Sequence, residues 1–118
     1  MLTLKSRHTI YGCHYLKNQG GKCQNIHGHE YKIILYLSLS KDKLDKKNMI
    51  LDTYEVEKIF NEFIGTDHLN LNEFIGSEDP TMEIMSIFFY NKLKKKIPSL
   101  SAVEVYETNN SSTLYIES

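Results

Sequence analysis

The sequence predicts an α+β fold that is built on long alternating strands. Residues 2–12 and 26–40 alternate apolar and polar residues with the period of a strand. Two segments in the middle of the chain instead repeat apolar residues three and four positions apart, as amphipathic helices do. Two short strands, near residues 102–108 and 113–117, complete the chain. The predicted order is strand, strand, helix, helix, strand, strand (ββααββ).

Each long strand has one apolar face, because successive side chains point to opposite sides. On the first strand this face carries Leu2, Leu4 and Ile10. The second strand follows a Gly20-Gly21 turn, and its apolar face carries Tyr31, Ile33, Leu35, Leu37 and Leu39. We expect both faces to contribute to the core.

The two helices have recognisable ends. The first is expected from about residue 53, with Asp52 and Glu55 as a capping box and Gly65 as its stop. The second is expected from Pro80, the first helical position after an Asp79 cap, and it ends in a run of lysines that suits the negative end of the helix dipole.

Size and charge limit the classes of function. At 118 residues, with 41% hydrophobic and 25% charged residues, the chain is expected to form one domain, residues 1–118. A net charge of −1 gives no field for a polyphosphate backbone, so a small-molecule partner is favoured over nucleic acid. No apolar run is long enough to span a membrane and no secretory signal is evident, so the cytoplasm is the expected location.

Three histidines are candidates for a metal site. His27 and His29 are two residues apart on the second strand, so both side chains point to the same face. His14 shares its parity with the apolar face of the first strand, and an antiparallel neighbour can present it to the same point. Three neutral imidazoles around Zn²⁺ leave a fourth position open, which is typical of catalytic sites. Against this, a single histidine in a strand is more often structural.

Four other residues allow more than one interpretation. Three interpretations of Cys23 stay open. It is either a fourth ligand that closes a structural metal site, an inert small residue, or a thiolate base beside the metal. Asp67 and His68 form an acid–base pair or a polar loop that caps helices. Glu107 shares the parity of the apolar residues on its strand, so its carboxylate needs a partner: a ligand with two adjacent N–H donors, an internal ion pair, or water at the strand end.

These residues together resemble the family of 6-pyruvoyl-tetrahydropterin synthase and 6-carboxytetrahydropterin synthase, over nearly the whole chain. The motifs that carry the resemblance are His14 before Leu16, Cys23-x-x-x-His27-Gly28-His29, Asp67-His68-x-x-Leu71-Asn72, Pro80-Thr81-x-Glu83 and Glu107-Thr108. The resemblance implies a tunnelling fold, with a four-stranded antiparallel sheet, two helices on one face, and subunits that join edge to edge into a barrel. It also implies a homohexamer of two trimers with active sites between subunits.

Residue roles follow from the same resemblance. His14, His27 and His29 are the implied zinc ligands, and Cys23, Asp67 and His68 the implied catalytic groups. Glu107 would anchor the pterin ring with help from Thr108.

The implied reaction is that of a lyase. It converts 7,8-dihydroneopterin triphosphate to 6-carboxy-5,6,7,8-tetrahydropterin, with release of acetaldehyde and triphosphate, on the route to queuosine. The three-residue spacing between Cys23 and His27 is similar to this bacterial branch.

Alternatives are a 6-pyruvoyl-tetrahydropterin synthase, a non-catalytic zinc-stabilised oligomer, and related chemistry on dihydroneopterin, which the retained Cys23 argues against. Gly12-Cys13, Tyr15 and Thr53 depart from the family pattern.

Overall fold

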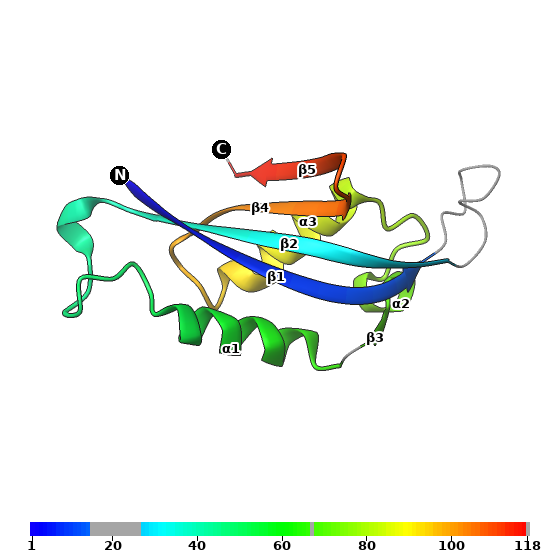
Figure 1. The fold of residues 1–118 in the computed structure, drawn as a ribbon, viewed down its shortest axis with the longest axis horizontal. Helices are drawn as coiled ribbons and strands as arrows, with labels where there is room; N and C mark the ends of the chain where they lie inside the picture. The colour runs from blue at the N-terminus through cyan, green and yellow to red at the C-terminus, as the bar shows by residue number, and fades with distance from the viewer. Residues whose placement is uncertain (15–26, 67, 118) are drawn as a thin grey trace.

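The computed structural model describes residues 1–14, 27–66 and 68–117, with only the backbone of His27. Its centre is a five-stranded sheet with the strand order β3-β1-β2-β4-β5 (Figure 1). The strands are β1 (Leu2–His14), β2 (His27–Leu39), β3 (His68–Asn70), β4 (Leu100–Thr108) and β5 (Ser111–Ile116). The four long strands pair antiparallel, as the sequence predicted, whereas β3 runs parallel to β1.

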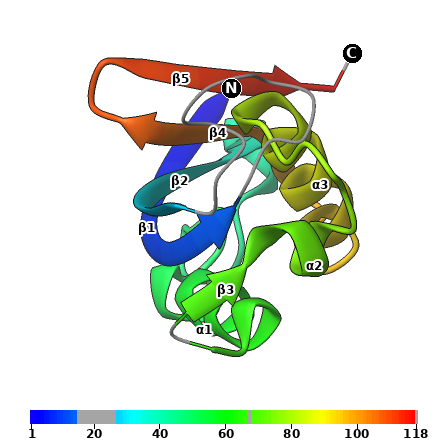
Figure 2. The same ribbon diagram turned by 90° about the vertical axis from the view of Figure 1, so that its right-hand side faces the viewer.

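The helices lie on one face of the sheet, which the view along the strands makes plain (Figure 2). They are α1 (Thr53–Ile64), α2 (Leu71–Ile75) and α3 (Met82–Lys94), and a short 3₁₀ helix, η2 (Lys41–Lys43), follows β2. The two long helices were predicted. None of the helices within the described ranges is long and apolar enough to cross a membrane.

The ends of α1 are those that its sequence predicts. The Asp52 side chain accepts a hydrogen bond from the Tyr54 N–H, and Gly65 ends the helix with a φ of 72°, in the left-handed region that glycine tolerates best.

The predicted start of α3 was wrong. It begins at Met82 rather than Pro80, because the hydroxyl of Thr81, not the side chain of Asp79, caps it by accepting from the Ile84 N–H.

The core lies between the sheet and the helices, on the face that the alternating pattern predicts. Tyr31, Ile33, Leu35 and Leu37 of β2 are fully buried there. The helices cover them with Val56 and Phe60 from α1 and with Met85, Phe89 and Leu93 from α3. Towards the end of the sheet where β1 stops and β2 starts, the inward-facing positions change from aliphatic to imidazole side chains.

Two short elements, β3 and α2, were not predicted, and they hold the end of β1. β3 pairs with Tyr11 to Cys13, and α2 follows it directly. Leu71 of α2 packs so closely on Gly12 that a Cβ at Gly12 would lie 3.1 Å from Leu71 Cγ and 3.3 Å from the Leu69 carbonyl oxygen. Gly12 therefore lets the chain after α1 pack against β1.

We predict that Gly12→Ala lowers the free energy of unfolding by about 1–3 kcal/mol, because the added methyl group forces Leu71 to move. Gly28→Ala is the matched control, because the nearest atom of the described residues would lie 3.7 Å from its Cβ. Its effect should stay within about 0.5 kcal/mol. Urea unfolding with EDTA present measures both variants, and equal losses would contradict the close packing at Gly12.

His8 lies between β1 and α1. Its side chain is buried, stacks on Phe60 with ring centroids 4.3 Å apart, and places Nε2 2.7 Å from the Ser6 hydroxyl. Burial lowers the pKa of His8 below its usual 6.5, and the charge of Glu57 opposes this shift only in part.

We predict that wild-type stability falls more steeply than that of His8→Gln as the pH drops from about 7.5 to about 5.5. The unfolded chain takes up a proton at His8 near its usual pKa, whereas the folded chain resists it, so this contribution to stability disappears on acidification. Urea unfolding at the two pH values measures the difference. Identical pH dependence of stability in both proteins would contradict the lowered pKa of His8.

Candidate metal centre

His14 is the last residue of β1. It lies on the face of the strand that points into the core, and the residue as a whole is 2% exposed. Its backbone pairs with that of His27 at the start of β2. The ring nitrogen Nδ1 lies 3.3 Å from the carbonyl oxygen of Pro80, in the segment before α3. His14 therefore joins the strand end to the start of a helix.

His29 and Glu107 complete a cluster with His14. His29 stands opposite Gly12 on the neighbouring strand, and its ring lies edge-on to that of His14 with centroids 5.5 Å apart. Near the end of β4, Glu107 Oε1 lies 2.8 Å from His29 Nε2 and 3.4 Å from His14 Nε2. One potential ligand atom from each residue lies within 4.8 Å of the other two.

The three side chains of the cluster differ in their exposure to solvent. The side chain of His14 is 1% exposed, whereas those of His29 and Glu107 are 27% and 25% exposed. Buried next to them, the phenol of Tyr31 has its pKa raised, first by desolvation and then by the negative charge of Glu107. His29 and Glu107 each line a surface hollow, and the two hollows are separate.

The donor set fits a transition-metal ion. Two imidazole nitrogens and a carboxylate oxygen, close together and partly out of water, are ligands that Zn²⁺ takes in proteins. The Pro80 carbonyl at His14 Nδ1 is the kind of outer contact that orients a metal-binding histidine. These residues fit a metal ion whose identity the donor set alone does not fix.

Several predicted site residues lie outside the cluster or outside the described part of the chain. Cys23, Asp67 and the side chain of His27 lie outside the described residues. The backbone of His27 does begin β2, directly opposite His14. Thr108 is exposed at the end of β4, where its hydroxyl accepts a hydrogen bond from the Asn110 N–H.

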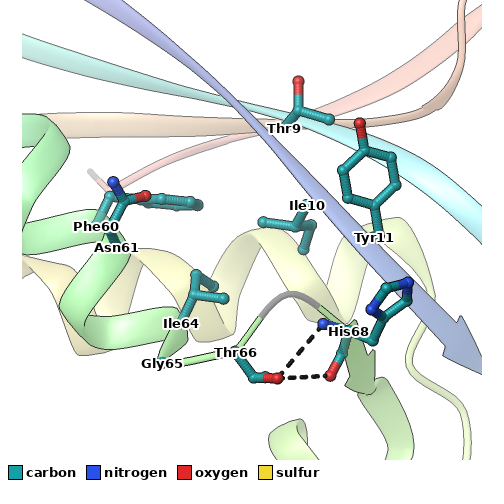
Figure 3. A pocket seen from close by; sticks show the side chains of 9 residues that line it. All are labelled: Thr9, Ile10, Tyr11, Phe60, Asn61, Ile64, Gly65, Thr66 and His68. Atoms are coloured by element: carbon teal, nitrogen blue, oxygen red, sulfur yellow. Dashed lines mark hydrogen bonds between the residues drawn. The ribbon is translucent and has the colours of Figure 1, made fainter.

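Among the described residues, His68 is not part of the cluster that His14, His29 and Glu107 form. It pairs with Tyr11 in β3, and the two rings, with centroids 6.4 Å apart, are exposed on the side away from the core. Figure 3 shows His68 at the rim of a cavity of about 740 Å³ between β1 and the end of α1, whose floor includes Ile10, Phe60 and Ile64. His68 also lines a smaller hollow of about 380 Å³, at the end of β1, together with Gly12 and His29.

Sequence reasoning missed two parts of the centre. Tyr31, expected only as a core residue, places its hydroxyl 3.3 Å from both ring nitrogens of His14. Its position two residues after His29 on the same face was the available signal. The contact of Pro80 with His14 joins positions 66 residues apart, and no local pattern predicts it.

Comparisons with known proteins identify the family. Residues 3–118 match the sequence profile of 6-pyruvoyl tetrahydropterin synthase. Two 6-carboxy-5,6,7,8-tetrahydropterin synthases are each 30% identical to this chain. The match to the Synechocystis sp. protein covers 86% of this chain and 83% of that protein. The match to the Haemophilus influenzae protein covers 88% of this chain and 91% of that protein. The structure of Caenorhabditis elegans 6-pyruvoyl tetrahydropterin synthase superposes with a TM-score of 0.85 at 26% identity, over 99% of this chain and 96% of that one.

The chain therefore belongs to the 6-pyruvoyl tetrahydropterin synthase family. The α+β architecture with its antiparallel sheet agrees with this family's fold.

Proposed function

We propose that this protein is a zinc-dependent lyase that converts 7,8-dihydroneopterin triphosphate to 6-carboxy-5,6,7,8-tetrahydropterin, releasing acetaldehyde and triphosphate. The observation that carries the proposal is the convergence of His14, His29 and Glu107 at one end of the sheet. The names of the Synechocystis sp. and Haemophilus influenzae relatives support the choice of product. On this proposal the protein acts in the cytoplasm, on the route to queuosine.

Each residue has a role in the proposed site. His14, His27 and His29 would hold the ion, and a bound Zn²⁺ would supply Lewis-acid stabilisation of negative charge on the substrate side chain. Glu107 would hold the pterin ring, because a carboxylate matches two adjacent N–H donors, with Thr108 assisting. Cys23 would accept a proton from the side chain of the substrate, with Asp67 and His68 as the acid–base relay.

The position of Glu107 supports its role as the ring anchor. Its carboxylate lies against both imidazoles yet keeps an exposed side, so a ring held there would have its side chain beside the ion. The same proximity allows Glu107 to be a metal ligand instead. The two roles predict different zinc contents for Glu107→Gln.

Assembly is part of the proposal. Among the described residues, His68 lies outside the group of His14, His29 and Glu107, although it lines one hollow with His29, and on this proposal a neighbouring subunit completes each site. The exposed edge of β5 and the edge of β1 not covered by β3 are available for strand pairing between copies, which would also remove open sheet edges. We propose a homohexamer of two trimers with sites between subunits.

A 6-pyruvoyl-tetrahydropterin synthase is the second candidate. It is favoured by the close superposition on the Caenorhabditis elegans enzyme. The two activities differ in whether a two-carbon fragment leaves the substrate.

We predict that wild-type protein binds one Zn²⁺ per chain and that His29→Ala loses it, because a ligand nitrogen has been removed. His68→Ala is the matched control: it also removes an imidazole, but one outside the group of His14, His29 and Glu107, and it should retain the metal. Atomic absorption after gel filtration gives the stoichiometry. Full zinc content in His29→Ala would refute the site.

We predict that zinc-loaded protein incubated with 7,8-dihydroneopterin triphosphate yields acetaldehyde and 6-carboxy-5,6,7,8-tetrahydropterin. Chromatography with mass detection identifies the pterin, and a coupled dehydrogenase assay measures acetaldehyde. Triphosphate release without acetaldehyde would instead establish the 6-pyruvoyl activity. Glu107→Gln should retain zinc and lose turnover if the carboxylate anchors the ring; loss of zinc would make Glu107 a metal ligand.

A further inference from the structure

Tyr31 is the most buried polar group beside the metal cluster. It is fully buried on the core face of β2, two residues after His29. Its ring lies edge-on to both imidazoles, with centroids 5.8 Å from that of His14 and 5.6 Å from that of His29. No role in metal binding or catalysis follows from its place in the apolar pattern of the strand.

The hydroxyl of Tyr31 contacts His14. Its oxygen lies 3.3 Å from both Nδ1 and Nε2, at the edge of the ring between the two nitrogens. Hydroxyl groups buried away from water are costly unless they are hydrogen-bonded, so this contact accounts for a phenol at a fully buried position.

A second contact fixes which nitrogen of His14 serves as the ligand atom. The Pro80 carbonyl oxygen lies 3.3 Å from Nδ1, and a carbonyl only accepts hydrogen bonds, so Nδ1 donates. The lone pair is then on Nε2, the nitrogen that faces Glu107, so with an ion bound there the Tyr31 oxygen accepts a share of the Nδ1 hydrogen and does not donate to Nε2. With the carbonyl on one side and the phenol at the ring edge, His14 has little freedom to rotate.

We propose that Tyr31 is a positioning residue that holds the imidazole of His14 in the orientation required for metal binding. The inference rests on the proposed metal site and adds to it a residue that does not touch the ion. Contacts of this kind typically change metal affinity by about 10–100-fold.

The test compares Tyr31→Phe with Tyr36→Phe. Both variants lose one tyrosine hydroxyl from β2, but the Tyr36 hydroxyl donates to Glu104 on the opposite face of the sheet. Competition with a chromophoric chelator measures zinc affinity. We expect Kd for zinc to rise about tenfold or more in Tyr31→Phe and to stay within about twofold in Tyr36→Phe. The visible spectrum of bound Co²⁺ should change in Tyr31→Phe alone.

The outcomes separate the inference from the proposed function. If wild type binds zinc and Tyr31→Phe binds it equally tightly with an unchanged Co²⁺ spectrum, Tyr31 only stabilises the core and the inference is wrong, even if the variant melts at a lower temperature. If wild type binds no zinc, both the metal site and the inference fail. Weakened binding in Tyr31→Phe alone supports the positioning role.

Discussion

The antiparallel pairing of β1 with β2 is the constraint on which the site depends. It places the last residue of β1, His14, opposite the first residue of β2, His27, and places Gly12 opposite His29. Because side chains alternate between faces, the pairing fixes which imidazoles point into the core. A shift of one residue would turn His29 outward, away from His14 and Glu107.

Apolar packing supplies the stability that a polar cluster in this position lacks. Ionisable groups that are partly removed from water lose solvation, and here they are compensated by one another and by the Pro80 carbonyl. The same face of the sheet, further along, is filled by fully buried aliphatic and aromatic side chains under α1 and α3. The site is thus the polar end of a core whose remaining length holds the strands in register.

The sequence predicted those features that depend on local periodicity. The long strands, the two long helices and the caps of α1 follow from side-chain patterns within a few residues, and the parity of Glu107 on β4 gave it the correct face. The three-residue strand β3 is too short to have a period, and it exists because of its pairing with β1. The cap of α3 was missed because Asp79 and Thr81 both suit such a position, and the local sequence does not decide between them.

The contacts of the site itself depend on tertiary structure. That His14 meets Pro80, Tyr31 and Glu107 follows from strand order and from the path of the chain into α3, which no single segment encodes. His68 shows the same limit, because only tertiary structure brings it to the hollow that it lines with His29, outside the group of His14, His29 and Glu107.

The most direct test of the account is crystallography of zinc-loaded protein at the zinc absorption edge. The account predicts one anomalous peak per chain, about 2.0–2.1 Å from nitrogens of His14 and His29. A third bond from His27 would complete the protein ligands and leave one position for substrate. A peak elsewhere, or an ion whose fourth ligand is the sulfur of Cys23, would contradict a catalytic metal centre.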